Sequence, residues 1–422
     1  MLRALLTAFR IKEIRNKILF TLAILAIYRL GANITIPGVD ATVILAQVET
    51  GVLGMMDLFA GGALGNFAVF SLGIMPYITA TIIMQLLQVV IPRLEQLSKE
   101  GETGRRKINQ ISRYLTVALA LIQSVSMTFF FRSLGAIPNF DVFNVALIVI
   151  TLTAGTTLIM WLGELINIHG IGNGISLIIF ANIVSRMPGQ LISLFRLQGT
   201  NYFFLALFAI LSIGIIMAII LITQGERKIP VQYAKRVVGR KVFGGQSTYL
   251  PLKVNQSGVM PIILAIAILL FPATIAQFIP NRWGWIQSFA DALSPSAQGN
   301  INPIYAISYT ILIIIFAYFY TAITFNPIDT ADNLRRYGGF IPGIRPGRNT
   351  SDYLTNVLNR ITLPGAVFLA IVALLPEVLI NYLQIPFRFG GTSILIAVGV
   401  ALDTMRQLES QLTMRDYEGF LK

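Results

Sequence analysis

Residues 142–163 read VFNVALIVITLTAGTTLIMWLG, a stretch of the 422-residue chain without a single Asp, Glu, Lys or Arg. The hydrocarbon core of a bilayer is about 30 Å thick, and a helix needs about 20 apolar residues to cross it. This stretch has that length and that composition. It therefore predicts a helix that spans a membrane.

Similar runs occur along the whole chain. The other strong ones are Ile18–Ile36, Phe67–Ile91, Tyr114–Phe131, Asn201–Thr223, Val254–Pro280 and Pro303–Ile328, and the weaker ones are Gly170–Ser185, Ile361–Pro376 and Phe389–Leu402. The three weaker runs are short for a span, so we expect them to extend into the flanking polar sequence or to be tilted within a bundle. Together these runs predict ten spans.

The composition supports a membrane protein and argues against an enzyme. Hydrophobic residues make up 55% of the chain and charged residues only 12%, too few charges to cover a soluble surface. The chain has no cysteine and one histidine, His169, and it lacks HExxH, GxSxG and P-loop patterns. We therefore expect no catalytic site, no metal and no cofactor.

The basic residues indicate the orientation in the membrane. The net charge is +13, and 26 of the 32 Lys and Arg residues fall in the N-terminus, in alternate loops and in the tail. Cytoplasmic segments carry such an excess, so ten spans with both termini in the cytoplasm fit the charges. Arg29 lies near the external end of the first span, where its side chain can extend to the interface.

Two cytoplasmic loops are longer than simple connections require. The first contains YAKRVVGRKVF from Tyr233 to Phe243, which predicts a basic β-hairpin-like protrusion. The second contains IPGIRPG, whose turn signals place Arg345 at a tip. Basic tips of this kind could meet an acidic protein surface or ribosomal RNA phosphates. Ordinary positive-inside loops are the simpler interpretation by charge alone.

The segment Met55–Pro76 contains four glycines and ends in proline. One continuous helix is therefore not expected, and a short half-helix followed by a full helix fits better. Broken backbone at membrane depth requires burial in protein or a water-filled cavity. An external amphipathic loop is the alternative interpretation.

The strong runs carry no charged residue near their centres. The predicted spans do carry uncharged polar residues, namely Thr79, Thr81, Gln85, Asn182, Asn255 and Gln256. These side chains either join helices by hydrogen bonds or line an interface that parts and closes. An ion-coupled secondary transporter, the main alternative function, needs a buried polar or charged site that these runs lack. A membrane-embedded enzyme and a structural scaffold are further rivals.

Ordered motifs across the chain give a resemblance to the bacterial SecY family. They include IPGVD from Ile36, GGAL from Gly61, LGIMPYI from Leu72, KEGETGRRK from Lys99, MWLGE from Met160, GIGNGIS from Gly170, YAKR from Tyr233, QST from Gln246, LPLKVN from Leu250, FNP from Phe325, TADNL from Thr330, PGIRPG from Pro342 and FGGTS from Phe389. Each motif is modest evidence, but the ordered set across ten spans is specific.

The resemblance implies a protein-conducting channel that translocates unfolded polypeptides across the membrane and releases membrane helices laterally. It implies an all-α fold of ten spans in two inverted five-helix halves around an hourglass pore. By the same resemblance, an aliphatic pore ring comprises Ile74, Ile78, Ile179, Ile263 and Ile396. Such a ring is narrow and apolar, so ions find no polar partner there.

The resemblance also assigns other sites. A plug at about residues 57–70 includes Asp57, Phe59, Gly61, Gly62, Leu64 and Phe67. The lateral gate lies between spans two–three and seven–eight, with Thr79, Gln85, Asn255 and Phe271. The docking residues for the SecA motor or the ribosome are Lys235, Arg236, Arg240 and Arg345. The implied partners are SecE, SecG, SecA, the ribosome, precursor proteins with signal sequences and membrane lipids, in a bacterial plasma membrane.

The predicted organisation follows from these assignments. An interfacial amphipathic helix occupies residues 1–17, the N-terminal half 18–200 and the C-terminal half 201–406. The C-terminal half contains cytoplasmic loops at 224–257 and 326–363, and a cytoplasmic tail follows at 407–422.

Overall fold

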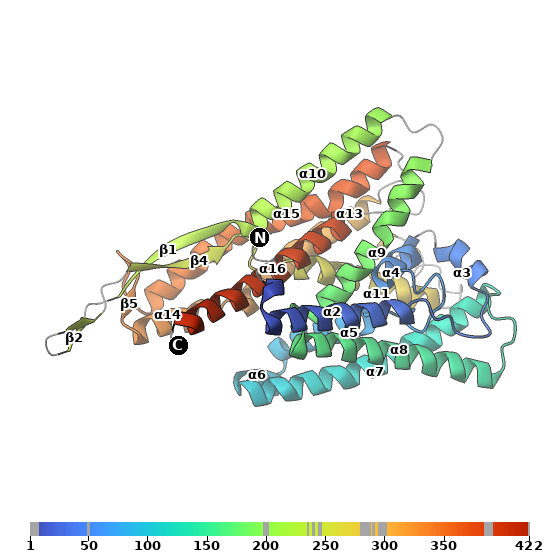
Figure 1. Cartoon of the computed structure of the whole chain (residues 1–422), viewed down its shortest axis with the longest axis horizontal. Coiled ribbons are helices and arrows are strands. Elements are labelled where there is room, and N and C mark those ends of the chain that lie inside the picture. The colour runs from blue at the N-terminus through green and yellow to red at the C-terminus, as the bar shows by residue number, and fades with distance from the viewer. Residues whose placement is uncertain are drawn as a thin grey trace.

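A computed structural model shows a long helical molecule with one β-ribbon at its end (Figure 1). It describes residues 8–48, 51–196, 202–233, 236–238, 241–243, 247–278, 288, 292–293, 302–383 and 391–420. Within these residues, ten long helices lie on the ten predicted runs, and shorter helices and strands connect them.

The N-terminal half contains five of the long helices. They are α2 (Lys12–Gly31), α5 (Met75–Val90), α7 (Glu102–Ser133), α8 (Val142–His169) and α9 (Gly174–Arg196), with the shorter helices α3 (Ala41–Val48), α4 (Gly51–Ala60) and α6 (Pro92–Lys99). Asp40 precedes α3, where its Oδ1 accepts from the Thr42 hydroxyl at 2.6 Å and the Thr42 N–H at 2.9 Å. These bonds lower the pKa of this exposed carboxyl.

The C-terminal half contains the other five. They are α10 (Tyr202–Gln224), α11 (Met260–Phe278), α13 (Pro303–Thr324), α15 (Arg348–Leu383) and α16 (Gly391–Phe420), with the short helix α14 (Pro327–Arg336). Within this half α13 packs between α11 and α15, and α10 packs on α15 and α16.

The number of spans is only partly resolved by length and composition. Among the described residues, four helices are long and apolar enough to cross a membrane: Glu102–Ser133, Val142–His169, Pro303–Arg336 and Arg348–Leu375. A fifth arises if α5 and α6, which meet at 100°, form one broken span. Three shorter apolar helices, Gly174–Gly189, Ile210–Gln224 and Met260–Leu270, lie on other predicted runs. The count of ten therefore stays a prediction.

The helices do not coincide with the apolar runs at every boundary. The helix of the first span begins at Lys12 rather than at residue 18, because the break falls at Ile11. The run Phe67–Ile91 is helical only from Met75, since residues 61–74 form turns. The second cytoplasmic loop has the predicted turns around Arg345 and also contains α14, whose N-terminus is capped by Asn326 Oδ1.

The three weaker runs do extend into polar sequence, as expected. The helix α15 begins thirteen residues before Ile361, at Arg348, and α16 continues past Leu402 to Phe420. The third, α9, continues beyond Ser185 to Arg196. Polar flanks therefore supply the length that the apolar cores lack.

The predicted hairpin is confirmed and is longer than expected. Strand β1 (Glu226–Tyr233) pairs antiparallel with β4 (Ser247–Lys253), and β2 (Arg236–Val238) pairs with β3 (Lys241–Phe243) at the tip. A short strand, β5 (Gly339–Phe340), pairs with β1 and joins the second cytoplasmic loop to this ribbon. Residues of β1 and β4 pack on the N-terminal part of α15, and the tip with β2 projects beyond the helices (Figure 1).

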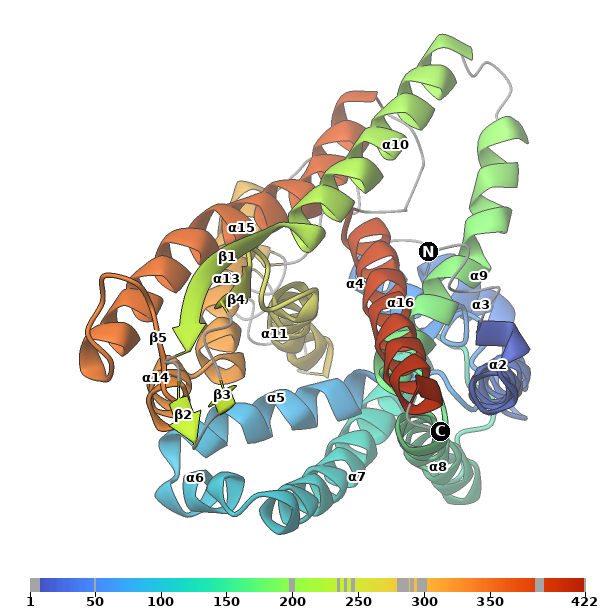
Figure 2. The same ribbon diagram turned by 60° about the vertical axis from the view of Figure 1, so that its left-hand side comes forward.

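Within the part of the chain that the structure describes, the halves meet along two lines. On one, α11 packs against α4, α5 and α7; on the other, α16 packs against α9 (Figure 2). One large hydrophobic cluster runs through both halves and includes residues of α2, α5, α8, α9, α11, α13 and α16. The interior is thus continuous from one half to the other.

Candidate functional site

The Gly-rich segment is broken, as the sequence predicts, and it is buried. Helix α4 ends at Ala60, turns occupy residues 61–74, and α5 begins at Met75. Leu64 and Phe67 are 0% and 1% exposed, which excludes the alternative of an external amphipathic loop. We call residues 51–74 the plug segment, because they contain the predicted plug at about residues 57–70; the role of a plug stays a prediction.

The C-terminus of α4 ends in a Schellman motif. The Gly62 N–H donates to Asp57 O at 3.0 Å, and the Gly61 N–H donates to Leu58 O at 3.3 Å. Gly61 has φ of 68°, the left-handed conformation that this motif needs and glycine adopts without strain. These two bonds pair two of the four carbonyl groups that every helix C-terminus leaves unbonded.

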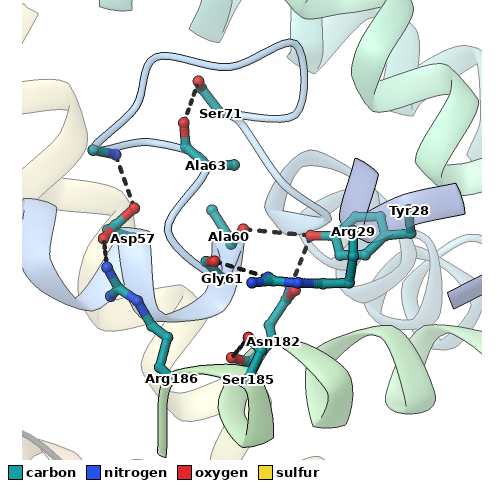
Figure 3. A network of polar contacts seen from close by, with 11 residues as sticks. Tyr28, Arg29, Asp57, Ala60, Gly61, Ala63, Ser71, Asn182, Ser185 and Arg186 are labelled. Carbon is teal, nitrogen blue, oxygen red and sulfur yellow. Dashed lines mark hydrogen bonds and ion pairs between the residues drawn. The ribbon is translucent and has the colours of Figure 1, made fainter. Parts of the chain in front are cut away.

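Side chains from the surrounding helices pair the other two carbonyls, and Figure 3 shows the bond to Ala60. Asn182 Nδ2 on α9 donates to Phe59 O at 2.6 Å, and the Tyr28 hydroxyl on α2 donates to Ala60 O at 3.4 Å. Asn182 Nδ2 also donates to the Tyr28 hydroxyl at 2.9 Å. The end of α4 is therefore held by its own turn and by two helices at once.

Arg29 adds a positive charge at the same helix end. Its Nη1 donates to Gly61 O at 2.9 Å. Carbonyl groups give a helix C-terminus a partial negative charge, which a cation stabilises. The expectation that Arg29 extends to the external interface was wrong, because these carbonyls offer its guanidinium a partner inside the protein.

Asp57 forms a second attachment. It is 2% exposed, its Oδ1 accepts from the Gly65 N–H at 2.9 Å, and its Oδ2 forms an ion pair with Arg186 on α9. A buried carboxylate is costly unless it is paired and hydrogen-bonded. Here it is both, so it ties the segment internally and to α9 (Figure 3).

The later part of the plug segment, which includes Val69 and Phe70, packs against α2, the turn after α2, and α8. The Val69 N–H donates to Ile34 O at 2.9 Å, and the Phe70 ring stacks on Tyr28 with centroids 5.4 Å apart. At Gly155 on α8, a side-chain Cβ would overlap the backbone oxygen of Val69. Helices α2, α8 and α9 therefore all contact the plug segment.

The five isoleucines of the predicted ring are all buried. Their exposed fractions are between 0% and 6%, and all five belong to the one large hydrophobic cluster: Ile74, Ile78, Ile179, Ile263 and Ile396. They come from both halves of the chain. Their role as a ring stays a prediction.

The residues predicted for the lateral gate make no hydrogen bond across it among those described. The Thr79 hydroxyl donates to Met75 O of its own helix at 3.0 Å, and Asn255 Nδ2 donates to Gly258 O at 3.0 Å. Gln85 is half-buried, and the side chain of Phe271 lies outside the described residues. The contact of α11 with α5 and α7 is formed largely by apolar side chains.

The predicted docking residues are only partly described. Arg345 is exposed in the turn before α15. Arg236 lies on β2, but its side chain is outside the described residues, as are Lys235 and Arg240.

Sequence reasoning named the plug segment but missed what holds it. Arg29 and Arg186 were considered only as external charges, and Tyr28 was not singled out. A signal existed on α9, because Ile179, Asn182 and Arg186 lie three and four residues apart in turn and so share one helix face. Because Asn182 and Arg186 share the helix face of Ile179, a predicted ring residue, their polar side chains are expected to bind a partner inside the helix bundle.

These features define a class of protein. The chain is a polytopic α-helical membrane protein whose halves enclose a broken, buried segment held by side chains of the surrounding helices.

Comparison with known proteins gives the family. The SecY family model matches residues 68–405. The chain is 48% identical to "Protein translocase subunit SecY" of Streptomyces galbus and 46% identical to that of Mycobacterium tuberculosis strain H37Rv, covering 100% of both chains in each case. The chain belongs to the SecY family.

Solved structures share the fold. "The structure of a protein conducting channel" matches with a TM-score of 0.61 at 19% identity, covering 94% of this chain and 92% of that one. "Sec61 in the Canine ribosome-channel complex from the endoplasmic reticulum" matches with a TM-score of 0.58 at 18% identity, with the same coverage.

Proposed function

We propose that this chain is the channel subunit of a protein translocase, which passes unfolded polypeptides across a membrane and releases membrane helices sideways into it. Full-length relatives at 46–48% identity carry the name of a protein translocase subunit. A solved structure of the same fold is described as a protein-conducting channel.

The observation that carries the proposal is the attachment of the plug segment. Four side chains of α2 and α9 (Tyr28, Arg29, Asn182 and Arg186) bind it through polar groups, beside otherwise apolar helices. Polar bonds of this type hold a segment in one place and can be exchanged for others when it moves. We infer that exchange of these bonds lets the segment leave its place and return to it, as a movable stopper does.

We place the pore at the five buried isoleucines. Ile74 directly precedes α5, at the end of the plug segment, and Ile179 lies one turn from Asn182 on α9. A constriction of isoleucines fits around a passing chain and, when narrow, excludes water and ions. A membrane helix leaves sideways through the contact of α11 with α5 and α7. Transfer of its apolar side chains into lipid drives this release.

The cytoplasmic ribbon and the turn at Arg345 are the docking surface in this proposal. Strand β5 joins the two loops into one sheet, so a partner can contact both together. We infer that the SecA motor or the ribosome binds there, that SecE and SecG complete the complex, and that both termini lie in the cytoplasm of a bacterial cell.

The experiment is crosslinking of a stalled precursor. The chain is reconstituted with SecE and a motor or ribosome, and a photoreactive residue is placed at Ile78 or Ile263, with exposed Ile150 of α8 as the matched control. Crosslinks at the first two positions and none at the third support the pore. Substrate crosslinks confined to other positions would contradict it.

A secondary transporter is not supported as the function. The family is that of protein translocase subunits.

A further inference from the structure

Asp403 lies on the face of α16 that carries the predicted ring residue Ile396. The two residues are seven positions apart on this helix, which corresponds to two turns and about 10 Å along its axis. Gly399, between them, belongs to the same face. Because we place the C-terminus in the cytoplasm, Asp403 lies on the cytoplasmic side of the proposed pore.

This face of α16 meets the residues just before α11. A Cβ added at Gly399 would overlap Val259 Cγ1, and a Cβ added at Gly258 would lie 3.7 Å from Asp403 Oδ2. Gly258 and Val259 directly precede Met260, the first residue of α11. Asp403 therefore lies beside the start of α11, the helix that forms the proposed sideways exit with α5 and α7.

The Asp403 carboxylate is exposed and has no bonded partner. Among the residues that the structure describes, no hydrogen bond reaches it and no cation forms an ion pair with it. Lys253 and Arg406 lie near enough for their charges to act on it. The Arg406 guanidinium donates instead to Thr223 O, at the end of α10, at 2.8 Å, and Lys253 is exposed. Both carboxylate oxygens are therefore available to a cationic donor.

The charge of Asp403 is opposite in sign to most of its side of the protein. Of the 32 Lys and Arg residues, 26 fall in the segments that we place in the cytoplasm. Such a surface repels a basic peptide. An exposed carboxylate at the mouth of the pore offers that peptide a position of attraction.

A secretory signal sequence fits this arrangement. It begins with a basic segment, which is followed by about 7–15 apolar residues. In the proposed function the apolar residues enter the contact of α11 with α5, while the basic segment stays on the cytoplasmic side. The basic segment then lies at the cytoplasmic start of α11, beside Asp403.

We propose that Asp403 binds a lysine or arginine in the basic segment of a signal sequence. The ammonium or guanidinium group donates to the carboxylate. This bond holds the N-terminus of the signal in the cytoplasm while its apolar residues enter the contact of α11 with α5. The inference rests on the proposed function, because it names the part of the precursor that this position recognises.

The first test changes the charge on each side of the pair. Two precursors are translocated into proteoliposomes, one with lysines in its basic segment and one with glutamines at the same positions. Asp403→Asn is expected to slow the lysine precursor about threefold, as for an ion pair at a partly exposed site, and to leave the glutamine precursor unchanged. Asp403→Glu should restore the lysine precursor. Asp352→Asn, at an exposed position of α15, is the matched control and should affect neither.

An equal effect of Asp403→Asn on both precursors would show a structural role for the carboxylate and overturn the inference. A third precursor, with glutamines in the signal and lysines in the mature part, separates the two sources of a basic side chain. If Asp403→Asn slows this precursor as much as the first, Asp403 acts on the passing chain and the inference is wrong.

The second test measures contact directly. The chain has no cysteine, so Asp403→Cys gives it a single thiol. A disulfide is expected with a cysteine in the basic segment of a stalled precursor, and none with a cysteine in its mature part. Ala401→Cys, at an exposed position two residues away on α16, should form neither. Disulfides of the basic segment with position 401 and not with position 403 would refute the inference.

The inference and the proposed function fail separately. If a stalled precursor crosslinks to Ile78 but its basic segment forms no disulfide with position 403, the channel stands and this inference alone is wrong. If no precursor crosslinks to Ile78 or Ile263, the proposed function fails, and the inference fails with it.

Discussion

Arg186 forms an ion pair with Asp57 across 129 residues of chain. The carboxylate is 2% exposed and the arginine side chain 30% exposed, so the plug segment carries a buried charge whose counter-ion belongs to α9. Removing either side chain leaves the charge of the other without its counter-ion.

Arg186→Gln should weaken the closed state. A hydrogen bond to a charged group contributes about 1.5–3 kcal/mol, and the exposed part of Arg186 places this one at the lower end. Proteoliposomes with the variant should therefore leak ions at rest. Asp57→Asn/Arg186→Gln should leak less than Arg186→Gln alone, since no unpaired buried charge remains. Equal leak from the single and double variants would argue against the ion pair as the cause.

Asn182→Ala should release the end of α4. The Phe59 carbonyl loses its donor in a buried site, which costs about 1–3 kcal/mol. Proteolysis or hydrogen exchange of residues 57–67 should become faster in the resting channel. Ser185→Ala is the matched control, because the Ser185 hydroxyl donates to Asn182 O of its own helix, and it should leave exchange unchanged.

Gly61→Ala should disturb the plug segment more than its backbone angle alone predicts. An alanine with positive φ costs about 1–2 kcal/mol, and at Gly61 the new Cβ would also overlap Asn182 Oδ1. Gly135 has a φ of 78°, and a Cβ added there would meet nothing within 4 Å, so Gly135→Ala reports the backbone cost alone. Thermal unfolding in detergent should separate the two variants, and identical midpoints would show that the close approach is unimportant.

Gly155→Ala should displace residues 67–70. Its Cβ would overlap the Val69 carbonyl, and backbone cannot move aside as a flexible side chain does. Gly189→Ala on α9, where a Cβ meets nothing within 4 Å, should be neutral or slightly stabilising. A resting ion leak from the first variant and none from the second is the expected result.

Much of the fold could be predicted because membrane spans are long and apolar. The run at 142–163 became α8 with its start at the predicted residue, and two short β-branched stretches around Gly239 predicted the ribbon. Helix α14 was missed because its short sequence is polar, and its start depends on the Asn326 cap and on Pro327.

The attachment of the plug segment could not be predicted in detail. The glycines predicted a broken helix. The side chains that bind its carbonyl groups belong to Tyr28 and Asn182, which are 154 residues apart in the sequence. Contacts between distant residues follow from how helices pack, which single-sequence periodicity does not contain. Arg29 therefore looked like an interfacial charge until its partner at Gly61 was visible.

The attachments at the end of α4 all act within one helical turn and the residue after it. Unwinding that single turn removes the carbonyl groups that Asn182, Tyr28 and Arg29 bind, and it displaces Asp57 as well. Local melting of a few residues thus breaks these attachments together, and it leaves the contacts of Val69 and Phe70 with α2 and its following turn. If the segment closes the passage as proposed, ligands or substitutions that stabilise this one turn should make opening rarer without touching the passage itself.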